Sequence, residues 1–364
     1  MSCKINVLEI DARDANMQSG IARYMDVLDE CMPAYVNTYR VIFYRDANTQ
    51  DVQIKFSGKE LSIRHPLNFP HHTLFEPVFA MLAPMLRNMQ NIIVKCNCLG
   101  LESFVYLVRN RICCKTIGIV HCMPPMPTVS NNIRTKNPFF NMDYIILVAP
   151  NGAQWLKYVN NTRPSRIIAN GIPKPIISNA NPRDGVFRFI FANGLSVNKG
   201  LAKIIPAIRR VAQKHKLEVM VLGGGGTKDQ VFDVSDLPIK FMGYISDKQK
   251  LADIYANSDC ALFASRSEAC SFAGIEALAY NLPIISGRAT GLTEMFDGVA
   301  KLIDFLPNGE INVEQYADAM MAVIENSRLR KKMAVLSYSR YVSRYTAGRM
   351  IQKTLKLYKQ VLGI

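Results

Sequence analysis

The sequence predicts an α/β protein with two Rossmann-like domains, each built on a parallel sheet, that face each other across a cleft. Apolar runs of strand length alternate with stretches of helical periodicity along most of the 364 residues, as in parallel sheets covered by helices. This alternation stops at a turn-rich stretch, residues 170–185, and then restarts. In open α/β sheets a ligand binds beyond the carboxyl ends of the strands, so the cleft is the expected site.

Composition narrows the classes of protein that fit. Apolar residues make up 49% of the chain and charged residues 20%, which is ordinary for a globular protein. The longest apolar uncharged run, residues 77–86, is far shorter than the ~20 residues of a membrane span. No signal-peptide pattern is visible, and nine irregularly spaced cysteines indicate a reduced, cytoplasmic protein. The Cys and His residues between 96 and 122 lack zinc-ligand spacing, so no metal is expected.

The first domain is expected at residues 1–175. Its opening strand, 4–10, is followed by a polar loop and a helix at 21–28, with Ser19 or Gly20 near the helix start. A loop of this kind before a helix is a weak signal for a phosphate-facing site. The apolar stretch 74–87 carries Pro77 and Pro84, which predicts a loosely packed lip instead of a regular core helix. Further strands are expected at residues 40–44, 91–95, 116–120, 143–148 and 166–169.

A turn-rich linker at 176–184 separates the first domain from the second, which is expected at residues 185–340. The remaining residues, 341–364, are expected to form a basic helix. The strands predicted in the second domain lie at residues 187–192, 218–222, 239–242, 260–264 and 283–286.

Two carboxylates mark the fourth of these strands and the helix that follows it. Glu268 is expected in the loop after the strand, and Glu276 inside the helix. The start of a helix offers unpaired N–H donors and a partial positive charge, which suit a phosphate. Ionised carboxylates beside it suit sugar hydroxyls, which donate strong hydrogen bonds to them. The alternative is that Glu268 is a solvated loop residue and Glu276 a charge on the helix surface.

The net charge of +15 is concentrated near the carboxyl end of the chain. Residues 328–359 contain ten Lys or Arg residues and no acid, interleaved with Tyr338, Tyr341, Tyr345 and Tyr358. Such a stripe suits nucleic acid, an anionic membrane surface or water alone. Nucleic acid is disfavoured because no known recognition motif accompanies the stripe. A peripheral membrane contact and a solvated helix face both remain open.

An ordered set of motifs resembles the family 4 glycosyltransferases, of the glycosyl transferases group 1 type, which are retaining enzymes with the GT-B fold. The first half of the chain matches more loosely than the second. The motifs lie at residues 19–24, His121, 170–172, 193–200, 221–226, 241–244, the Glu268 and Glu276 pair, and 291–294. The resemblance also implies that the last helix crosses back to the first domain.

The resemblance assigns roles in donor binding to the second domain. Glu276 would hold the ribose hydroxyls and Glu268 the hydroxyls of the transferred sugar. The backbone of Ser271, Phe272 and Ala273 would approach that sugar and the diphosphate.

The remaining roles concern the charge of the diphosphate and the first domain. Lys199 would neutralise the diphosphate as its charge grows in the transition state. Gly20 would let its loop approach the phosphates, and His121 would contact the donor sugar. The family commonly has an Arg where Gly194 stands. Arg266 and Arg288 are the nearest candidates in the sequence to replace it.

The sequence thus predicts a hexosyltransferase that uses a nucleotide-sugar donor and no cofactor or metal, since the Asp-x-Asp metal motif is absent. The acceptor would be a glycan or a lipid-linked molecule in surface polysaccharide or glycolipid synthesis, at the inner face of the membrane. Three alternatives stay open: a non-catalytic nucleotide-sugar-binding protein of the same fold, a glycosidase that uses the Glu pair, and a sugar-nucleotide epimerase.

Overall fold

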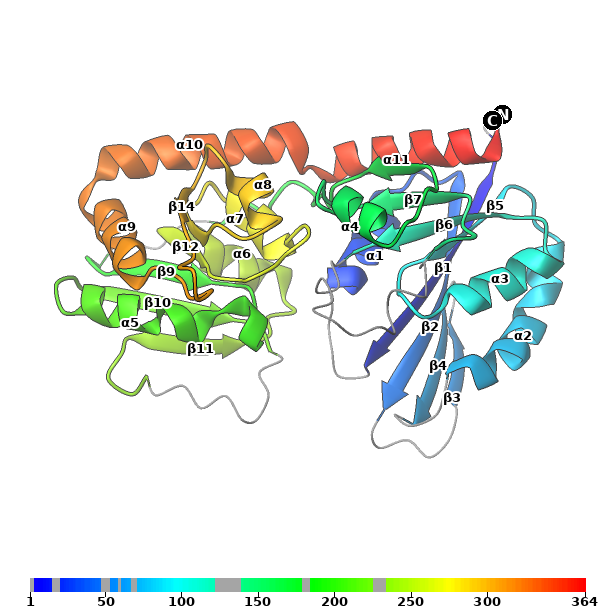
Figure 1. The fold of residues 1–364 in the computed structure, drawn as a ribbon, viewed down its shortest axis with the longest axis horizontal. Helices are drawn as coiled ribbons and strands as arrows, with labels where there is room; N and C mark the ends of the chain where they lie inside the picture. Colours follow the sequence, from blue (N-terminus) through cyan, green and yellow to red (C-terminus); the bar gives the residue numbers. More distant parts are fainter. Residues whose placement is uncertain are drawn as a thin grey trace. The chain divides into compact units, whose positions relative to one another are not determined.

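The computed structural model describes residues 3–14, 20–46, 53–57, 60–66, 71–121, 139–178, 184–224 and 234–364. The chain forms two compact units (Figure 1): unit 1 is Met1–Ala169 with Gly348–Ile364, and unit 2 is Asn170–Ala347. The division lies at Ala169 and not at residue 175, because the next residues bond to unit 2. The Asn170 side chain donates to the Cys270 carbonyl at 2.9 Å, and the Ile172 amide donates to the Tyr345 carbonyl at 3.0 Å.

Unit 1 contains an eight-stranded sheet in the order β3-β4-β2-β1-β5-β6-β7-β8. All neighbouring strands are parallel except β3, which pairs antiparallel with β4 at the edge. Neither β3 nor β4 was predicted. The strands are β1 (Ile5–Asp14), β2 (Val36–Asp46), β3 (Gln53–Ser57), β4 (Glu60–Pro66), β5 (Ile92–Cys96), β6 (Lys115–Val120), β7 (Tyr144–Leu147) and β8 (Ser165–Ile167).

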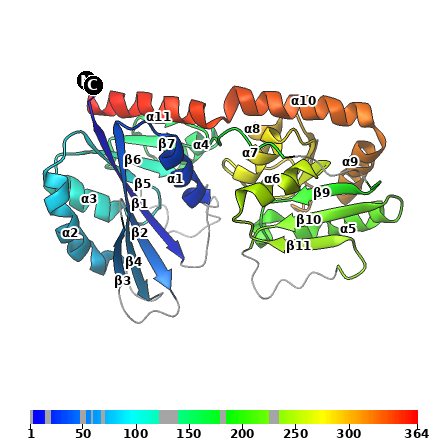
Figure 2. The same ribbon diagram turned by 180° about the vertical axis from the view of Figure 1, so that it is seen from behind.

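Helices cover both faces of this sheet. Figures 1 and 2 show α2 and α3 on one side of it and α1 on the other. Side chains alternate along β1, so Leu8 and Ile10 pack in the core with α2 and α3. The last helix, α11, contributes Tyr358 to unit 1, so the chain returns to its first unit. The helices are α1 (Gly20–Cys31), η1 (His71–Leu74), α2 (Phe75–Arg87), α3 (Glu102–Arg111), α4 (Gly152–Tyr158) and α11 (Ala347–Leu362).

The predicted lip at residues 74–87 is wrong, because α2 is a regular helix. Val78 and Leu82 on its inner face are at most 4% exposed. Pro77 lies in the first turn, where the backbone N–H has no partner within the helix in any case. Pro84 removes one hydrogen bond near the end of the helix, and burial of the apolar face outweighs that loss.

Unit 2 contains a six-stranded sheet in the order β11-β10-β9-β12-β13-β14, with parallel neighbours throughout. This is the doubly wound order, which recurs in strands β4-β2-β1-β5-β6-β7 of unit 1. The predicted pair of Rossmann-like domains is therefore confirmed. The strands are β9 (Phe187–Phe191), β10 (Leu217–Leu222), β11 (Ile239–Gly243), β12 (Cys260–Phe263), β13 (Ile284–Gly287) and β14 (Lys301–Ile303).

The helices of unit 2 also lie on two faces. Helices α5 and α9 share one core cluster with β9, β10 and β12, and α7 packs with α10. Within the described residues, no helix is both long and apolar enough to cross a membrane. The helices are η2 (Val197–Lys199), α5 (Leu201–Ala212), α6 (Lys248–Ala256), α7 (Phe272–Ala279), α8 (Leu292–Phe296), α9 (Val313–Glu325) and α10 (Ser327–Arg344).

Candidate functional site

The candidate site lies at the carboxyl ends of β9 and β12, which are neighbours in the sheet of unit 2. Parallel strands place the residues that follow them at one edge of the sheet. The chain leaves β9 through Asn193 towards Lys199, and it leaves β12 through Ser265 towards Glu268. Residues 75 positions apart in the sequence therefore come into contact.

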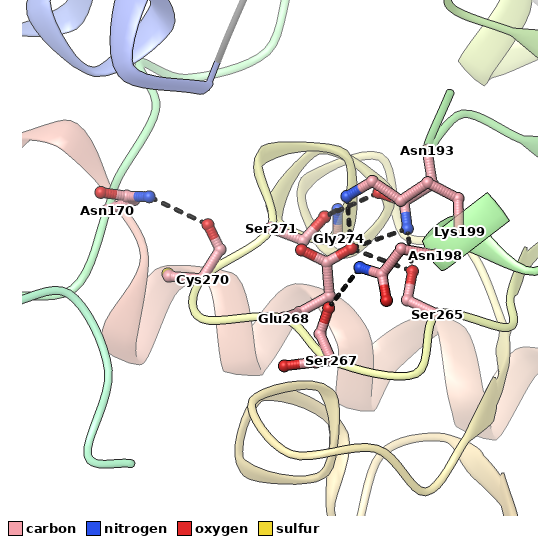
Figure 3. Close-up of polar contacts among 10 residues, drawn as sticks. All are labelled: Asn170, Asn193, Asn198, Lys199, Ser265, Ser267, Glu268, Cys270, Ser271 and Gly274. Atoms are coloured by element: carbon pink, nitrogen blue, oxygen red, sulfur yellow. Dashed lines mark hydrogen bonds and ion pairs between the residues drawn. The ribbon is translucent and has the colours of Figure 1, made fainter. Parts of the chain in front are cut away.

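Three donors converge on one carboxylate oxygen, Oε1 of Glu268 (Figure 3). Lys199 Nζ donates to it at 2.5 Å, Ser265 Oγ at 2.9 Å and Asn193 Nδ2 at 3.1 Å. Asn193 Nδ2 also donates to Ser265 Oγ at 2.6 Å. Ser265 is fully buried, whereas the side chains of Glu268 and Lys199 are 12% and 26% exposed. The carboxylate is thus fixed in position but is not sealed from solvent.

The start of α7 is attached to the same cluster. Ser271 caps the helix, because its Oγ accepts from the Gly274 amide at 3.2 Å. The same hydroxyl donates to Asn193 Oδ1 at 3.3 Å. Phe272 and Ala273 form the first turn, where backbone N–H groups lack partners within the helix. Figure 3 shows that Ser271 and Gly274, at the start of α7, lie beside the Lys199 and Glu268 pair.

Two glycines allow the backbones of the site to approach each other. Gly200 has φ of 77°, and a Cβ there would lie 2.2 Å from the Ala264 carbonyl oxygen. Gly291 has φ of 83°, and a Cβ there would lie 2.1 Å from the Glu268 carbonyl oxygen. Both positions require a left-handed backbone and have no room for a side chain. Any other residue would displace the loop that carries Glu268.

Glu276 lies further along α7 and has a different environment. Its Oε2 accepts from the Tyr255 hydroxyl at 2.9 Å. The Tyr255 ring is buried and stacks on Tyr280 with a centroid distance of 5.0 Å. Burial and the charge of Glu276 hold the pKa of Tyr255 well above its usual value, so this phenol stays protonated and keeps donating. Tyr255 therefore fixes the orientation of the half-buried carboxylate.

The cations considered as replacements for an Arg at position 194 have partners of their own. The Arg266 guanidinium is exposed and donates to the Gly309 carbonyl at 2.9 Å. Arg288 pairs with Asp304 at 2.6 Å. Gly194 has φ of 82°, and its amide donates to the Leu222 carbonyl at 3.2 Å. The roles of Gly194 and Arg266 in donor binding stay predictions.

His121 and Gly20 belong to unit 1. Gly20 is exposed at the first position of α1. His121 follows β6, and its Nε2 lies 3.1 Å from Asn97 Oδ1. Burial and the charge of Lys95 lower the pKa of His121 to about 3, so the imidazole is neutral near pH 7. The predicted contacts of both residues with the donor stay predictions.

The sequence interpretation left out the residues that support these groups. In unit 2 these are Asn193 and Ser265, and their signal was a polar residue directly after a buried strand. In unit 1 the Lys95 ammonium donates to Glu9 Oε1 at 2.5 Å, and both side chains are at most 1% exposed. The sequence signal for this pair was a charged residue inside each of two apolar strands, an acid in one and a base in the other. In the described ranges, no three His, Cys, Asp or Glu residues are placed to hold a metal ion.

Comparison with known proteins agrees with this architecture. Residues 187–326 match the family model described as glycosyl transferases group 1. A GDP-mannose-dependent alpha-(1-6)-phosphatidylinositol dimannoside mannosyltransferase of Mycobacterium tuberculosis is 31% identical over 103 residues. That match covers 28% of this chain and 27% of the mycobacterial protein, so the chain matches about a quarter of that relative's length.

Solved structures match nearly the whole chain. Sucrose-phosphate synthase from Thermosynechococcus elongatus has a TM-score of 0.74 at 16% identity and covers 99% of this chain and 100% of its own. An E. coli structure described as trehalose-6-phosphate bound with UDP-2-fluoro glucose has a TM-score of 0.73 at 12% identity, with 98% and 99% covered. At these identities the likeness shows the fold. The chain has the GT-B fold, and its residues 187–326 are similar to the glycosyl transferases group 1 family.

Proposed function

We propose that this protein is a retaining glycosyltransferase that moves a hexose from a nucleotide-sugar donor to a glycan or lipid-linked acceptor without a metal ion. The observation that supports it most is the Lys199 and Glu268 pair beside the start of α7, inside the group 1 domain. These groups match the parts of a nucleotide sugar. The cation and the helix N–H groups suit the diphosphate and the charge of the leaving group, and the carboxylate suits the sugar hydroxyls.

In this proposal Lys199 and the start of α7 stabilise the diphosphate. An ammonium has three N–H donors, so Lys199 can hold Glu268 with one and a phosphate oxygen with another. As the bond to the sugar breaks, negative charge grows on the departing phosphate, and a cation already in place stabilises it without reorganisation. Glu268 accepts from a hydroxyl of the transferred sugar.

Glu276 binds the ribose. Its carboxylate accepts from the two ribose hydroxyls, and the Tyr255 hydroxyl holds one of its oxygens in place. The names of two similar proteins mention GDP-mannose and UDP-2-fluoro glucose, which are nucleotide-diphosphate sugars. A glycosidase is disfavoured because Glu268 contacts a lysine and Glu276 a tyrosine, which leaves neither carboxyl in the apolar setting of a general acid.

The test is a panel of GDP- and UDP-activated hexoses with lipid-linked and soluble glycan acceptors. Binding is measured by calorimetry, and turnover by the release of free nucleotide. At least one donor is expected to bind and to release nucleotide faster when an acceptor is present. Binding without turnover would favour the non-catalytic alternative, and free sugar without an acceptor product would favour hydrolysis. Failure of every donor to bind would refute the proposed function.

We also propose that α10 contacts an anionic membrane surface that carries the acceptor. Three of the four tyrosines in the basic stripe are buried and structural, and Tyr338 alone is exposed. Val335 and Val342, at 69% and 44% exposed, recur at helical spacing with Tyr338 and with exposed Lys331. Apolar and basic side chains on one helix face suit a surface of anionic lipid.

Vesicle sedimentation tests the membrane contact. The protein is expected to sediment with vesicles of phosphatidylglycerol and phosphatidylcholine, and less with phosphatidylcholine alone. Replacing Val335 and Val342 by Glu should abolish sedimentation, whereas replacing exposed Lys248 and Lys250 of α6 by Glu should not. If the unaltered protein does not sediment with anionic vesicles, the membrane contact is wrong.

A further inference from the structure

The interior of unit 1 holds an ion pair at the centre of its sheet. Glu9 of β1 and Lys95 of β5 are direct partners in the parallel register. The Lys95 ammonium donates to Glu9 Oε1 at 2.5 Å, and both side chains are at most 1% exposed. Burial alone would lower the pKa of Lys95, but its interaction with Glu9 raises it well above its usual value, so Lys95 is an ammonium. A buried ammonium requires a counter-charge, so Glu9 is its carboxylate partner and only accepts hydrogen bonds.

The second oxygen of that carboxylate fixes the orientation of Asn97. Asn97 is 2% exposed, and its Nδ2 donates to Glu9 Oε2 at 2.6 Å. The reverse orientation would place the amide oxygen against a carboxylate oxygen, with no proton between them. The NH₂ group therefore faces Glu9, and the carbonyl oxygen faces His121. The chemistry of the neighbours requires this assignment.

The orientation of Asn97 in turn fixes the proton on His121. Asn97 Oδ1 lies 3.1 Å from His121 Nε2, and an amide oxygen only accepts, so Nε2 must carry the hydrogen. The ring is neutral, because burial and the charge of Lys95 lower its pKa to about 3. Tyr24 contacts the ring edge-on at 4.7 Å and holds its plane. With Nε2 protonated in a neutral imidazole, Nδ1 carries a lone pair.

We propose that Lys95, Glu9 and Asn97 are positioning residues that hold His121 in the Nε2–H tautomer, so that Nδ1 is a fixed hydrogen-bond acceptor for a hydroxyl of the donor sugar. The contact with the sugar rests on the proposed function, whereas the tautomer does not. The contacts form a series. The Lys95 ammonium holds the Glu9 carboxylate, and that carboxylate fixes the orientation of the Asn97 amide. The amide oxygen in turn determines which nitrogen of His121 is protonated. A bare ring nitrogen accepts from a hydroxyl and cannot donate to a phosphate oxygen.

The first experiment measures the tautomer without any donor. Imidazole ¹⁵N resonances of the full chain are recorded, and His121 is assigned by its absence in His121→Gln. The spectra should show protonated Nε2 and bare Nδ1, unchanged from pH 8 to pH 4.5. In Asn97→Ala both tautomers should be populated and His121 should titrate closer to its ordinary pKa of about 6.5. A role of Asn97 in packing alone would leave the tautomer unchanged.

Two results would overturn the proposal: Nδ1–H as the main tautomer of the unaltered protein, or an unchanged tautomer and titration in folded Asn97→Ala. If Asn97→Ala does not fold, the spectra of the unaltered protein decide, because an imidazolium that forms near pH 6 or a mixed tautomer contradicts a fixed acceptor. The tautomer can be measured even if no nucleotide sugar binds. Failure of this proposal and failure of the proposed function are therefore distinguishable.

The second experiment tests the contact with the donor. Asn places its polar atoms two bonds from Cβ, as Nδ1 is, whereas Gln places them three bonds away, as Nε2 is. His121→Asn should therefore keep most of the affinity for the donor found in the panel. His121→Gln should weaken it about tenfold, the effect of one lost hydrogen bond. Equal affinity of the two variants, or a greater loss in His121→Asn, would show that Nδ1 does not hold the sugar.

Discussion

Each unit places a lysine and a glutamate at its central strands, and both pairs are 2.5 Å apart. They differ in exposure. Lys95 and Glu9 are at most 1% exposed, whereas Lys199 and Glu268 are 26% and 12% exposed. Glu9 and Lys95 lie within their strands and pair directly across β1 and β5. Lys199 and Glu268 lie in the segments that follow β9 and β12, outside the paired residues of the sheet.

The difference separates a structural ion pair from one that suits binding. In the interior, the attraction of two charges only offsets the cost of removing them from water, and neither can be lost alone. At the edge of a sheet that cost is smaller, and a ligand can replace part of the solvent around the pair. The same contact distance therefore predicts opposite results on mutation: loss of folding in unit 1 and loss of activity in unit 2.

The largest expected effect is on stability. Lys95→Met leaves Glu9 charged and unpaired in the interior, which should lower the free energy of unfolding of unit 1 by about 3–5 kcal/mol. Lys199→Met should lower that of unit 2 by about 1 kcal/mol or less, because its pair is partly solvated. Urea titrations followed by circular dichroism measure both.

A double replacement sharpens the contrast. Glu9→Leu combined with Lys95→Met removes both charges, so the double variant should be more stable than Lys95→Met alone. Equal losses for Lys95→Met and Lys199→Met, or a double variant as unstable as the sum of its singles, would contradict the distinction between the two pairs.

The second effect is on catalysis and rests on the proposed function. Lys199→Met removes the cation that stabilises the departing diphosphate, so kcat should fall by about 10²–10³-fold, the loss typical of one electrostatic group in the transition state. Lys203→Met is the matched control. Lys203 lies one turn along α5, and its ammonium is 3.4 Å from Glu310, outside the cluster. If kcat falls equally in both variants, the loss results from the change in net charge and not from the position of Lys199.

Most strands could be predicted from the sequence because the periodicity of apolar residues is visible within a short segment. The strand predicted at 187–192 is observed at Phe187–Phe191, and that at 116–120 at Lys115–Val120. The edge strand β3 and its partner β4 were both missed, because polar and apolar residues alternate along them and neither has the apolar run of a buried strand. The regular helix α2 was missed because the cost of its two prolines was considered without the stabilisation from burial of its apolar face.

The candidate site was only partly predictable. Glu268 and Lys199 came from ordered motifs, but their direct contact depends on which strands are neighbours in the sheet. Asn193 and Ser265 are common polar residues whose importance appears only when both meet Glu268. Buried charges were harder still, because Lys95 in an apolar strand resembles an edge residue until its partner on β1 is known.

The third effect concerns the nucleotide and compares Glu276 with the tyrosine that orients it. Glu276→Gln keeps the shape of the side chain but replaces charged acceptors by weaker ones, so donor affinity should fall by about 1.5–3 kcal/mol. Removing Tyr255 Oη in Tyr255→Phe should cost less, about 1 kcal/mol, since it only orients Glu276. Calorimetry with the donor and with the free nucleotide measures both. An unchanged affinity of Glu276→Gln for the free nucleotide would contradict the ribose contact.

The smallest effect is a pH dependence that belongs to unit 1 alone. The pKa of His121 is lowered to about 3 in the folded protein, against about 6.5 unfolded. Between these values the unfolded chain binds a proton that the folded chain does not, so stability falls as pH falls through 6.5. From pH 7 to pH 5.5 this residue should cost about 1 kcal/mol of unfolding free energy. His121→Gln removes that contribution, so the difference in unfolding free energy between the two proteins should change by this amount over the range. A constant difference would mean that His121 binds its proton at the same pH in the folded and unfolded states, which would contradict the effect of burial and of the Lys95 charge on its pKa.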